Sequence, residues 1–516
     1  GIRRAFLYIE NVDRVPDMTK EQKDAGKGEA YVIIASHYLD LFRNYGGIPL
    51  LRQAIAADNV MSYDFSRKTA EETLDYIVEL CDKAAGLLPW TVPAVDDGHF
   101  TKASAMGLKC RALLFAASPL FNASQPYSAS TPVARNANAD HVSQEDIPKM
   151  YWLGGYDAGR WQKVVDACED FIRENEENGN AYALVEASGI SSDDYRNAWN
   201  TSYADRYNGE ILMETGRHYD TFASTYLRCY FGVSSDHGNA GRGYGGGCVT
   251  LNFVDMFTAA DGTPSDYRKW LSDHGHDGTV YNNPFTGKDP RLYETVLIAG
   301  DRYRTRCAET WIDGLEHGSS ANPKCATGFI IRKFLWDYND EFLNKATNSA
   351  YIRLPELYLM YAEALNELGR SEEALSWLNK TRTRVGLPEM TLPNAAKIHS
   401  EQALPDYPEC SLKGDKYLRE EILDERAREF CFEEVRWFDI AFWKREDLMR
   451  KLLYGIQITR KSGSFEEGNL VLTYSDPSKM DQGRIWQDKF SPKWFLSAFP
   501  SDEINKGYGL VQNPGW

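Results

Sequence analysis

The most informative part of the sequence is YIRLPELYLMYAEALNELGRSEEALSWLNKTRTRVGLP, Tyr351 to Pro388. Its apolar residues recur at helical spacing on both sides of Gly369, which predicts two helices joined by a tight turn. Ala362 and Ala374 are small where the two helices have to approach each other. This is tetratricopeptide spacing. Because such a helix pair buries its apolar face only against neighbouring pairs, the stretch predicts a scaffold.

Helical patterns continue on both sides of this pair. TKASAMGLKCRALLFAASPLF predicts a helix that begins after an N-cap at Thr101 and ends at Pro119. From residue 188 to 350 the helical period fades, and Gly, Asn, Asp and aromatic residues predict an irregular lobe. The predicted fold class is therefore mainly α, with tetratricopeptide-like helix pairs in an α/α superhelix beneath a loop-rich lobe. The expected parts are 1–187 (helical scaffold, first part), 188–350 (ligand lobe), 351–447 (tetratricopeptide-like helices) and 448–516 (irregular C-terminal segment).

Charges alternate in sign along the helical segment LDERAREFCFEEVRWFDI, residues 423–440. The alternating residues are Glu425, Arg426, Glu429, Glu433 and Arg436. This pattern is typical of solvent-exposed or helix-bridging ion pairs, worth roughly a few tenths of a kcal/mol each. We therefore expect these charges to lie on the helix surface.

Overall charge and cysteine content exclude several classes of protein. The 58 basic and 75 acidic residues give a net charge of −17, with no basic block that would suit nucleic acid or an anionic membrane. No apolar run approaches the ~18 residues that a membrane-spanning helix needs. The nine cysteines include no CxxC pair, so neither a disulfide framework nor a zinc site is expected. Cys307 and Cys325 flank a loop and are the one pair considered for a bridge.

Two short motifs imitate cofactor or metal sites. GRGYGG, residues 241–246, fits the dinucleotide pattern G-x-G-x-x-G, but a polar stretch precedes it where that fingerprint needs a β-strand. SDHGHDG, residues 272–278, places His274 and His276 between two aspartates, but adjacent residues in a glycine-containing turn rarely all point at one ion. We expect a flexible loop and a solvated turn, and neither a cofactor nor a metal.

Seven blocks of the chain, in order, resemble the SusD/RagB family of outer-membrane nutrient-binding lipoproteins. They are GIRRAFLYIENVDRV (1–15), LFRNYGGIPLL (41–51), TKASAMGLKCRALLFAASPLFN (101–122), KDPRLYETVL (288–297), the repeat at Tyr351, LDERAREFCFEEVRWFDI (423–440) and SDEINKGYGLVQNPGW (501–516). The resemblance implies a surface-exposed lipoprotein of the cell outer membrane that binds an oligosaccharide and passes it to a SusC-like TonB-dependent transporter, without catalysis. It also implies that roughly the first hundred residues of a typical member, with the N-terminal lipid anchor, precede this chain.

If the ligand is a sugar, aromatic side chains are the first candidates for its site. Sugar rings present C–H faces that stack on aromatic rings, and their hydroxyls need polar partners on a rigid frame. The lobe supplies both kinds of residue. The candidate ligand-binding residues are Trp199, Tyr203, Tyr207, Tyr230, Asn239, Tyr244 and Trp311. For each single ring, burial as a loop anchor is the alternative role.

Two other functions remain open from the sequence. A RagB-like member of the same family would bind peptides, which also contact Tyr and Trp. An α-helical glycoside hydrolase would use paired carboxylates, but neighbours such as Asp193 and Asp194 do not give the facing separation of ~5 to 9.5 Å that the mechanism requires. No HExxH, GxSxG or phosphate-binding loop is present in the sequence. The prediction is therefore a binding protein.

Overall fold

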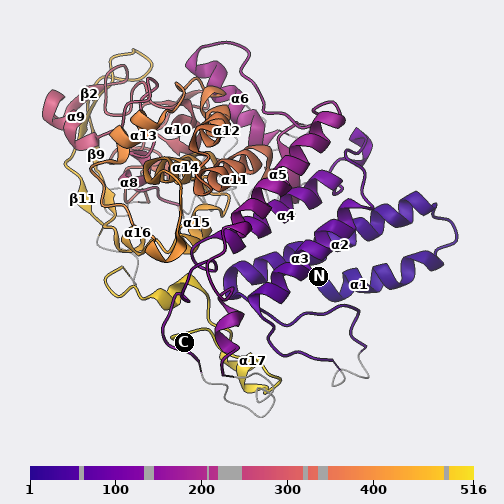
Figure 1. Cartoon of the computed structure of the whole chain (residues 1–516). Helices are drawn as coiled ribbons and strands as arrows, with labels where there is room; N and C mark the ends of the chain where they lie inside the picture. The colour runs from indigo at the N-terminus through magenta and orange to yellow at the C-terminus, as the bar shows by residue number, and fades with distance from the viewer. Residues whose placement is uncertain are drawn as a thin grey trace.

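The computed structural model describes residues 1–56, 63–132, 144–205, 208–218, 247–317, 324–334, 347–480 and 487–516. Long helices fill the first part of the chain, on the right of Figure 1. They are α1 (Ile2–Asn11), α2 (Lys20–Tyr45), α3 (Ala70–Ala85), α4 (Lys102–Ala117) and α5 (Gly159–Glu177). Successive helices pack side by side, and no helix within the described ranges is both long and apolar enough to span a bilayer.

Local sequence explains where these helices begin. Thr19, Thr69 and Thr101 each accept a hydrogen bond from the backbone N–H three residues later, while that residue's side chain caps the threonine N–H in return. Such capping boxes satisfy backbone donors that a helix start otherwise leaves unpaired. The predicted cap at Thr101 is confirmed, and α4 ends two residues before Pro119.

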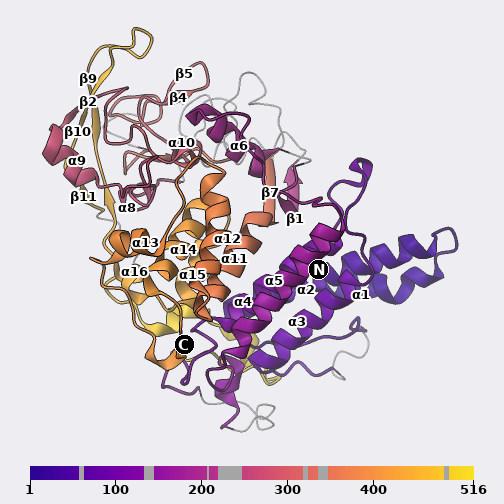
Figure 2. The same cartoon turned by 45° about the horizontal axis from the view of Figure 1, so that its top comes forward.

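The predicted helix pair is α11 (Leu354–Glu367) and α12 (Ser371–Thr383). Gly369 in the turn has φ +83°, a left-handed conformation that glycine adopts without steric cost. Ala362 and Ala374 are fully buried, as expected for a close helix contact. Figure 2 shows α11 and α12 between the N-terminal helices and the lobe, and α11 packs on both α4 and α5. The mainly α, tetratricopeptide-like fold is thus confirmed.

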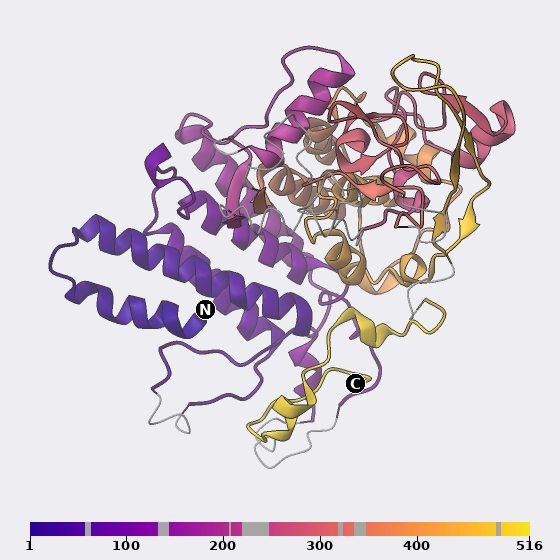
Figure 3. The same ribbon diagram turned by 180° about the vertical axis from the view of Figure 1, so that it is seen from behind.

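Further helices complete the second part of the scaffold. They are α13 (Leu392–His399), α14 (Lys416–Glu429), α15 (Arg436–Phe442) and α16 (Glu446–Arg450). The C-terminal segment, yellow in Figure 3, passes under the N-terminal helices and includes α17 (Ser501–Asn505). Arg67 holds it there, because its guanidinium donates to the carbonyl of Val511 (2.9 Å) and to Oδ1 of Asn513 (2.7 Å).

The lobe is built from short elements around its own apolar cluster. Its helices are α6 (Ser192–Ala204), α8 (Leu251–Val254), α9 (Tyr267–His274) and α10 (Pro290–Thr295). The lobe is less irregular than its sequence predicts, because α6 has 13 residues and a capping box at Ser191. The second apolar cluster of the molecule includes Phe257, Leu292 and Phe329, and it also takes Leu472 from the C-terminal segment.

The strands are short and pair antiparallel. β1 (Ile211–His218) pairs with β7 (Thr347–Arg353) in a ribbon beside α6 and α4. β10 (Val471–Tyr474) pairs on one side with β2 (Asp277–Thr279) and on the other with β9 (Ile458–Ser462). The remaining two-residue pairs are β3 (Val296–Leu297) with β6 (Ile330–Ile331), β4 (Arg302–Tyr303) with β5 (Arg306–Cys307), and β8 (Tyr454–Gly455) with β11 (Ser478–Lys479). Strands β9 and β10 thus bring part of the C-terminal segment into a sheet with β2 of the lobe.

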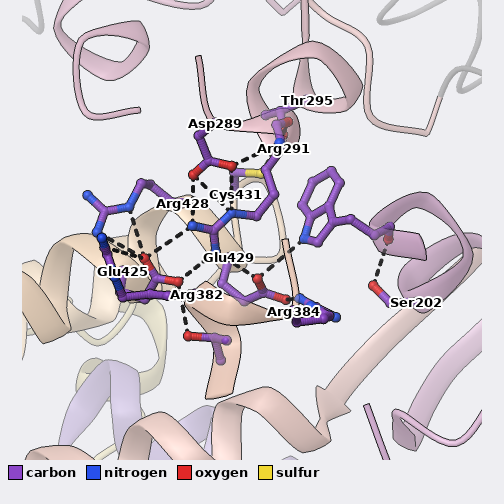
Figure 4. A network of polar contacts seen from close by, with 12 residues as sticks. Ser202, Asp289, Arg291, Thr295, Arg382, Arg384, Glu425, Arg428, Glu429 and Cys431 are labelled. Carbon is purple, nitrogen blue, oxygen red and sulfur yellow. Dashed lines mark hydrogen bonds and ion pairs between the residues drawn. The ribbon is translucent and has the colours of Figure 1, made fainter. Parts of the chain in front are cut away.

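A buried ion network joins the lobe to the scaffold (Figure 4). Arg291 of α10 donates to Glu425 (2.7 Å) and Glu429 (3.0 Å) of α14 and also pairs with Asp289. All four side chains are fully buried. Burial alone would raise the pKa of Glu425 and of Glu429, but the surrounding arginines hold both pKa values well below the ordinary range. These carboxylates are therefore ionised inside the protein.

The expectation of surface charges on residues 423–440 was wrong for most of these charges, and the segment is not one helix, because α14 ends at Glu429 and α15 begins at Arg436. Glu425, Arg426 and Glu429 are fully buried, and Glu433 is 8% exposed. Arg353, Arg384 and Arg428 arrive from other elements or from the next turn and neutralise the acids. Alternating charge looks the same in sequence whether the partners are water or distant arginines, so the pattern alone could not distinguish them.

Candidate functional site

The structure packs three of the predicted ligand residues into the interior. Trp199 is fully buried; its ring lies 4.9 Å from that of Tyr203, and its Nε1 donates to Glu429 (3.3 Å). The Lys333 ammonium sits over both rings at 4.8 and 4.6 Å. Trp311 is 5% exposed in the apolar cluster of the lobe. Each of these rings therefore has the anchoring environment named above as the alternative.

The other four predicted residues are Tyr207, Tyr230, Asn239 and Tyr244. They lie outside the described residues, as does the glycine-rich stretch 241–246. The two histidines of the SDHGHDG turn, for which no metal was expected, are described. Nδ1 of His274 lies 3.1 Å from the carbonyl of Trp270, and Nδ1 of His276 lies 2.7 Å from that of Tyr474. Within the described ranges no three His, Cys, Asp or Glu side chains are placed to hold a metal ion.

An open cavity of 490 Å³ lies on the lobe. All of its lining residues fall within 188–350 except Val385 and Gly386, which follow α12. Open pockets of this size, with a few polar groups among apolar ones, are typical of small-ligand sites. We call it the Tyr195 cavity, after the aromatic residue at its rim.

Tyr195 rests on the backbone of a glycine from a distant segment of the chain. A Cβ atom built on Gly386 would lie 2.3 Å from Cε2 of the Tyr195 ring, so the ring packs directly against this glycine. Gly386 has φ +76°, which also favours glycine there. Tyr195 is half-buried and lines the cavity, and its hydroxyl makes no hydrogen bond to any described residue. The chain therefore presents a supported aromatic ring with a free polar edge.

A rigid floor lies beside this ring. The Tyr293 hydroxyl donates to the carbonyl of Phe285 (2.5 Å) and accepts from the N–H of Lys288 (3.1 Å). Burial raises the pKa of Tyr293 to about 12. Arg196 lies 5.1 Å from the Tyr293 ring and is held by Glu294 (2.7 Å) and by Asp301 (2.9 Å). Because these groups already have partners, the floor keeps its shape before any ligand arrives.

Polar groups with hydrogen-bond donors to spare surround the rim. The Ser192 hydroxyl, on the first turn of α6, has no partner among the described residues. The Lys288 ammonium donates to Oγ of Ser265 (2.6 Å) and keeps further N–H groups, while burial lowers its pKa. Thr286 accepts the N–H of Asn283 (3.1 Å), which leaves its own hydroxyl hydrogen available. An aromatic face beside hydroxyl and ammonium donors is chemistry that suits a polyhydroxylated ligand.

Sequence reasoning missed Tyr195 and Tyr293. Tyr195 lies four residues before Trp199 on α6, so the two share one side of the helix, yet Trp199 is fully buried and Tyr195 is not. Tyr293 stands in KDPRLYETVL, a block read above only as a mark of the family. A helical position shows which residues share a face, but the edge of the buried face depends on Gly386, about 190 residues away in sequence.

Comparisons with known proteins agree with this architecture. Residues 191–516 match the model described as the SusD family, and residues 1–114 match one described as "Starch-binding associating with outer membrane". A SusD-like protein of Formosa agariphila is 32% identical over an alignment of 459 residues that covers 85% of this chain and 70% of that protein. Among solved structures, a SusD-like protein of Bacteroides fragilis has a TM-score of 0.71 at 22% identity, covering 100% of this chain and 84% of that one. A laminarin binding SusD-like protein has a TM-score of 0.55 at 17% identity, covering 100% and 84%.

Proposed function

The chain belongs to the SusD family, and on that premise we propose that it binds an oligosaccharide in the Tyr195 cavity without chemical turnover. In this proposal the protein is a surface-exposed outer-membrane lipoprotein. It holds the glycan for a SusC-like TonB-dependent transporter. The description of the family model that matches residues 1–114 supports both the ligand class and the membrane, and the printed name of a structural neighbour supports the ligand class.

The observation that carries the proposal is the supported ring of Tyr195. An aromatic ring backed by Gly386 can stack on a sugar without having to be ordered first, which saves conformational entropy on binding. Ser192, Thr286 and Lys288 then supply hydrogen-bond donors for the hydroxyls around the ring. We extend the proposal to Tyr207, Tyr230, Asn239 and Tyr244, which belong to the same stretch of the chain.

Calorimetry with a polysaccharide panel that includes starch and laminarin tests the proposal. Tyr195→Ala is expected to weaken binding of the recognised glycan about tenfold, since aromatic contacts contribute about 0.5–1.5 kcal/mol beyond their buried area. Tyr281→Ala is the matched control, because Tyr281 is 74% exposed on the same lobe but does not line the cavity. Equal losses in both variants would contradict this site.

Two further measurements separate the competing functions. Release of reducing ends well above a buffer control, abolished by substitution of one acid, would make the protein a glycoside hydrolase and overturn the binding proposal. Competition between peptides and the recognised glycan distinguishes a peptide-binding member. If a peptide displaces the glycan from the wild type but not from Tyr195→Ala, the ligand class proposed here is wrong.

A further inference from the structure

Two cysteines meet where the chain enters α8. Cys248 lies in an extended segment that pairs antiparallel with the segment containing Ile330. The pairing is held by the N–H of Val249 donating to the carbonyl of Phe329 (3.1 Å) and by that of Ile331 donating to Gly247 (3.2 Å). The backbone position of Cys248 is therefore set by hydrogen bonds on both sides.

The Cys248 side chain reaches the peptide bond that precedes Cys325. Its thiol donates to the carbonyl of Lys324, with Sγ and O 3.4 Å apart. That carbonyl carbon is bonded to the backbone nitrogen of Cys325, so the Cys248 sulfur lies within one peptide unit of the second cysteine. Burial raises the pKa of the Cys325 thiol well above its ordinary value, and proximity to Cys248 raises it further.

The two thiols differ in access. Cys248 is exposed, whereas Cys325 is 2% exposed and its sulfur is close to the backbone N–H groups of Gly328 and Thr327. Both are free thiols in the structure. Thiol reactivity follows exposure and thiolate character, so an oxidant reaches Cys248 first.

The other described cysteines have no such arrangement of one exposed and one buried thiol. Cys81, Cys110, Cys168, Cys307, Cys410 and Cys431 are all buried. Cys307, considered with Cys325 on sequence grounds, is also a free thiol and packs in the larger apolar cluster of the lobe, while Cys325 packs in a separate small one with Tyr303 and Ile330. The structure therefore gives Cys325 a different neighbour from the one that loop position suggested.

We propose that Cys248 and Cys325 are an oxidisable pair that forms an intramolecular disulfide. The oxidant is a small-molecule disulfide. The Cys248 thiolate attacks it, forms a mixed disulfide and releases one thiol. Cys325 then loses its proton to solvent and attacks the Cys248 sulfur, which expels the second thiol. The oxidant takes up the two electrons and two protons that the cysteines lose, and the new bond ties the entry to α8 to the loop before β6.

Incubation of the folded protein with oxidised glutathione tests the pair. Mass spectrometry of the wild type is expected to show loss of two hydrogen masses, and a non-reducing digest should contain one peptide that joins Cys248 to Cys325. Cys325→Ser should stop at glutathione bound to Cys248, because the attacking sulfur is gone. Cys248→Ser should give no cross-link to Cys325, while Cys307→Ala, the matched control, should cross-link as the wild type does.

Three results would overturn the proposal. One is a wild type that keeps glutathione on Cys248 as Cys325→Ser does. Another is a digest in which Cys325 is joined to Cys307. The third is a bond from Cys229, which lies outside the described residues, to either member of the pair. Because the readout is covalent, it does not depend on whether any glycan binds in the Tyr195 cavity.

Discussion

The helical scaffold and its junction with the lobe are stabilised by different interactions. Within the scaffold, Ile34, Leu108 and Leu359 belong to one continuous apolar cluster and are fully buried. At the junction, Arg291 and Glu425 are equally buried but are held by ion pairs. Apolar contacts are short-ranged. Shortening one buried apolar side chain therefore costs the free energy of burying the removed atoms plus that of the cavity they leave. A buried charge, in contrast, destabilises the fold as soon as one partner is removed.

The largest expected effect comes from breaking the junction. Arg291→Met keeps much of the side-chain volume but leaves Asp289, Glu425 and Glu429 short of a counter-charge. Removal of one partner from a buried pair costs about 3–5 kcal/mol, so the free energy of unfolding in urea should fall by that amount. Lys506→Met is the control; it breaks the exposed pair with Glu503 and should leave the transition almost unchanged. An Arg291 variant as stable as this control would show that the network is not structural.

Removing a side chain from the scaffold core should lower the free energy of unfolding slightly less than breaking the junction does. Its effect should also combine differently with that of Arg291→Met. Leu108→Ala removes a fully buried side chain from α4 and is expected to cost about 3 kcal/mol. Combined with Arg291→Met, its cost should add within about 0.5 kcal/mol, because the two sites share no partner. Combined with Arg291→Met, Glu425→Gln should instead give a coupling of about 1–3 kcal/mol. Equal additivity in both urea series would contradict the contrast between the two regions.

Glu363 in the scaffold behaves opposite to Glu425 and Glu429 of the junction. Glu363 accepts a hydrogen bond from Trp443 (2.7 Å), but its second oxygen accepts none and lies 4.0 Å from Nε of Arg426, and burial raises its pKa from 4.5 to about 8. Its folded pKa is above the unfolded one, so its contribution to stability is complete below pH ~4.5 and is lost as the pH rises through about 8. The Glu363→Gln side chain stays neutral at every pH. The free energy of unfolding of this variant in urea should therefore rise relative to that of the wild type by about 1 kcal/mol per pH unit between pH 6 and 8. A constant difference across this range would exclude the raised pKa.

Glu421 of α14 has the reverse sign. The pKa of Glu421 is lowered to about 2 by Arg428 and His399 against the effect of burial. The stability that Glu421 supplies is therefore present above pH ~4.5 and is lost as the pH falls toward 2. The loss of unfolding free energy on acidification toward pH 2 should be the same in Glu363→Gln as in the wild type, so it serves as an internal control.

The smallest effect concerns a helix start. Thr69→Ala removes the side-chain acceptor of the capping box of α3 and should lower the free energy of unfolding by about 1 kcal/mol. Ser376→Ala is the matched control, because its hydroxyl lies on the exposed face inside α12 and caps nothing. If the two alanine variants melt together in urea, the capping box does not stabilise the scaffold.

Local sequence was sufficient to predict the helix pair at Tyr351 and the helix after Thr101. Gly369, Thr101 and Pro119 act through backbone conformation, N-cap hydrogen bonding and a missing N–H, all of which depend on a few neighbours in the chain. These features predicted the repeat and the helix before it. In the lobe, α6 was underestimated because its residues are mostly polar and its start depends on a capping box rather than on apolar period.

The sequence predicted the region of the chain that supplies most of the lining of the candidate site, but not the residues. The Tyr195 cavity is lined by residues of 188–350, where aromatic and glycine residues concentrate, and by Val385 and Gly386. Which ring faces the cavity was not predictable, because Trp199 is buried by Glu429 and Lys333, and Tyr195 is supported by Gly386. All three partners are distant in sequence.

Helix starts, turns and apolar period are set by residues within a turn or two of each other, so the amino-acid sequence alone predicted the tetratricopeptide-like helix pairs. The burial of the α14 charges and the open position of Tyr195 beside a glycine became known only from the folded chain. Both have one cause. Exposure depends on which distant segment covers a side chain, and neither Arg291 nor Gly386 is near its partner until the chain has folded.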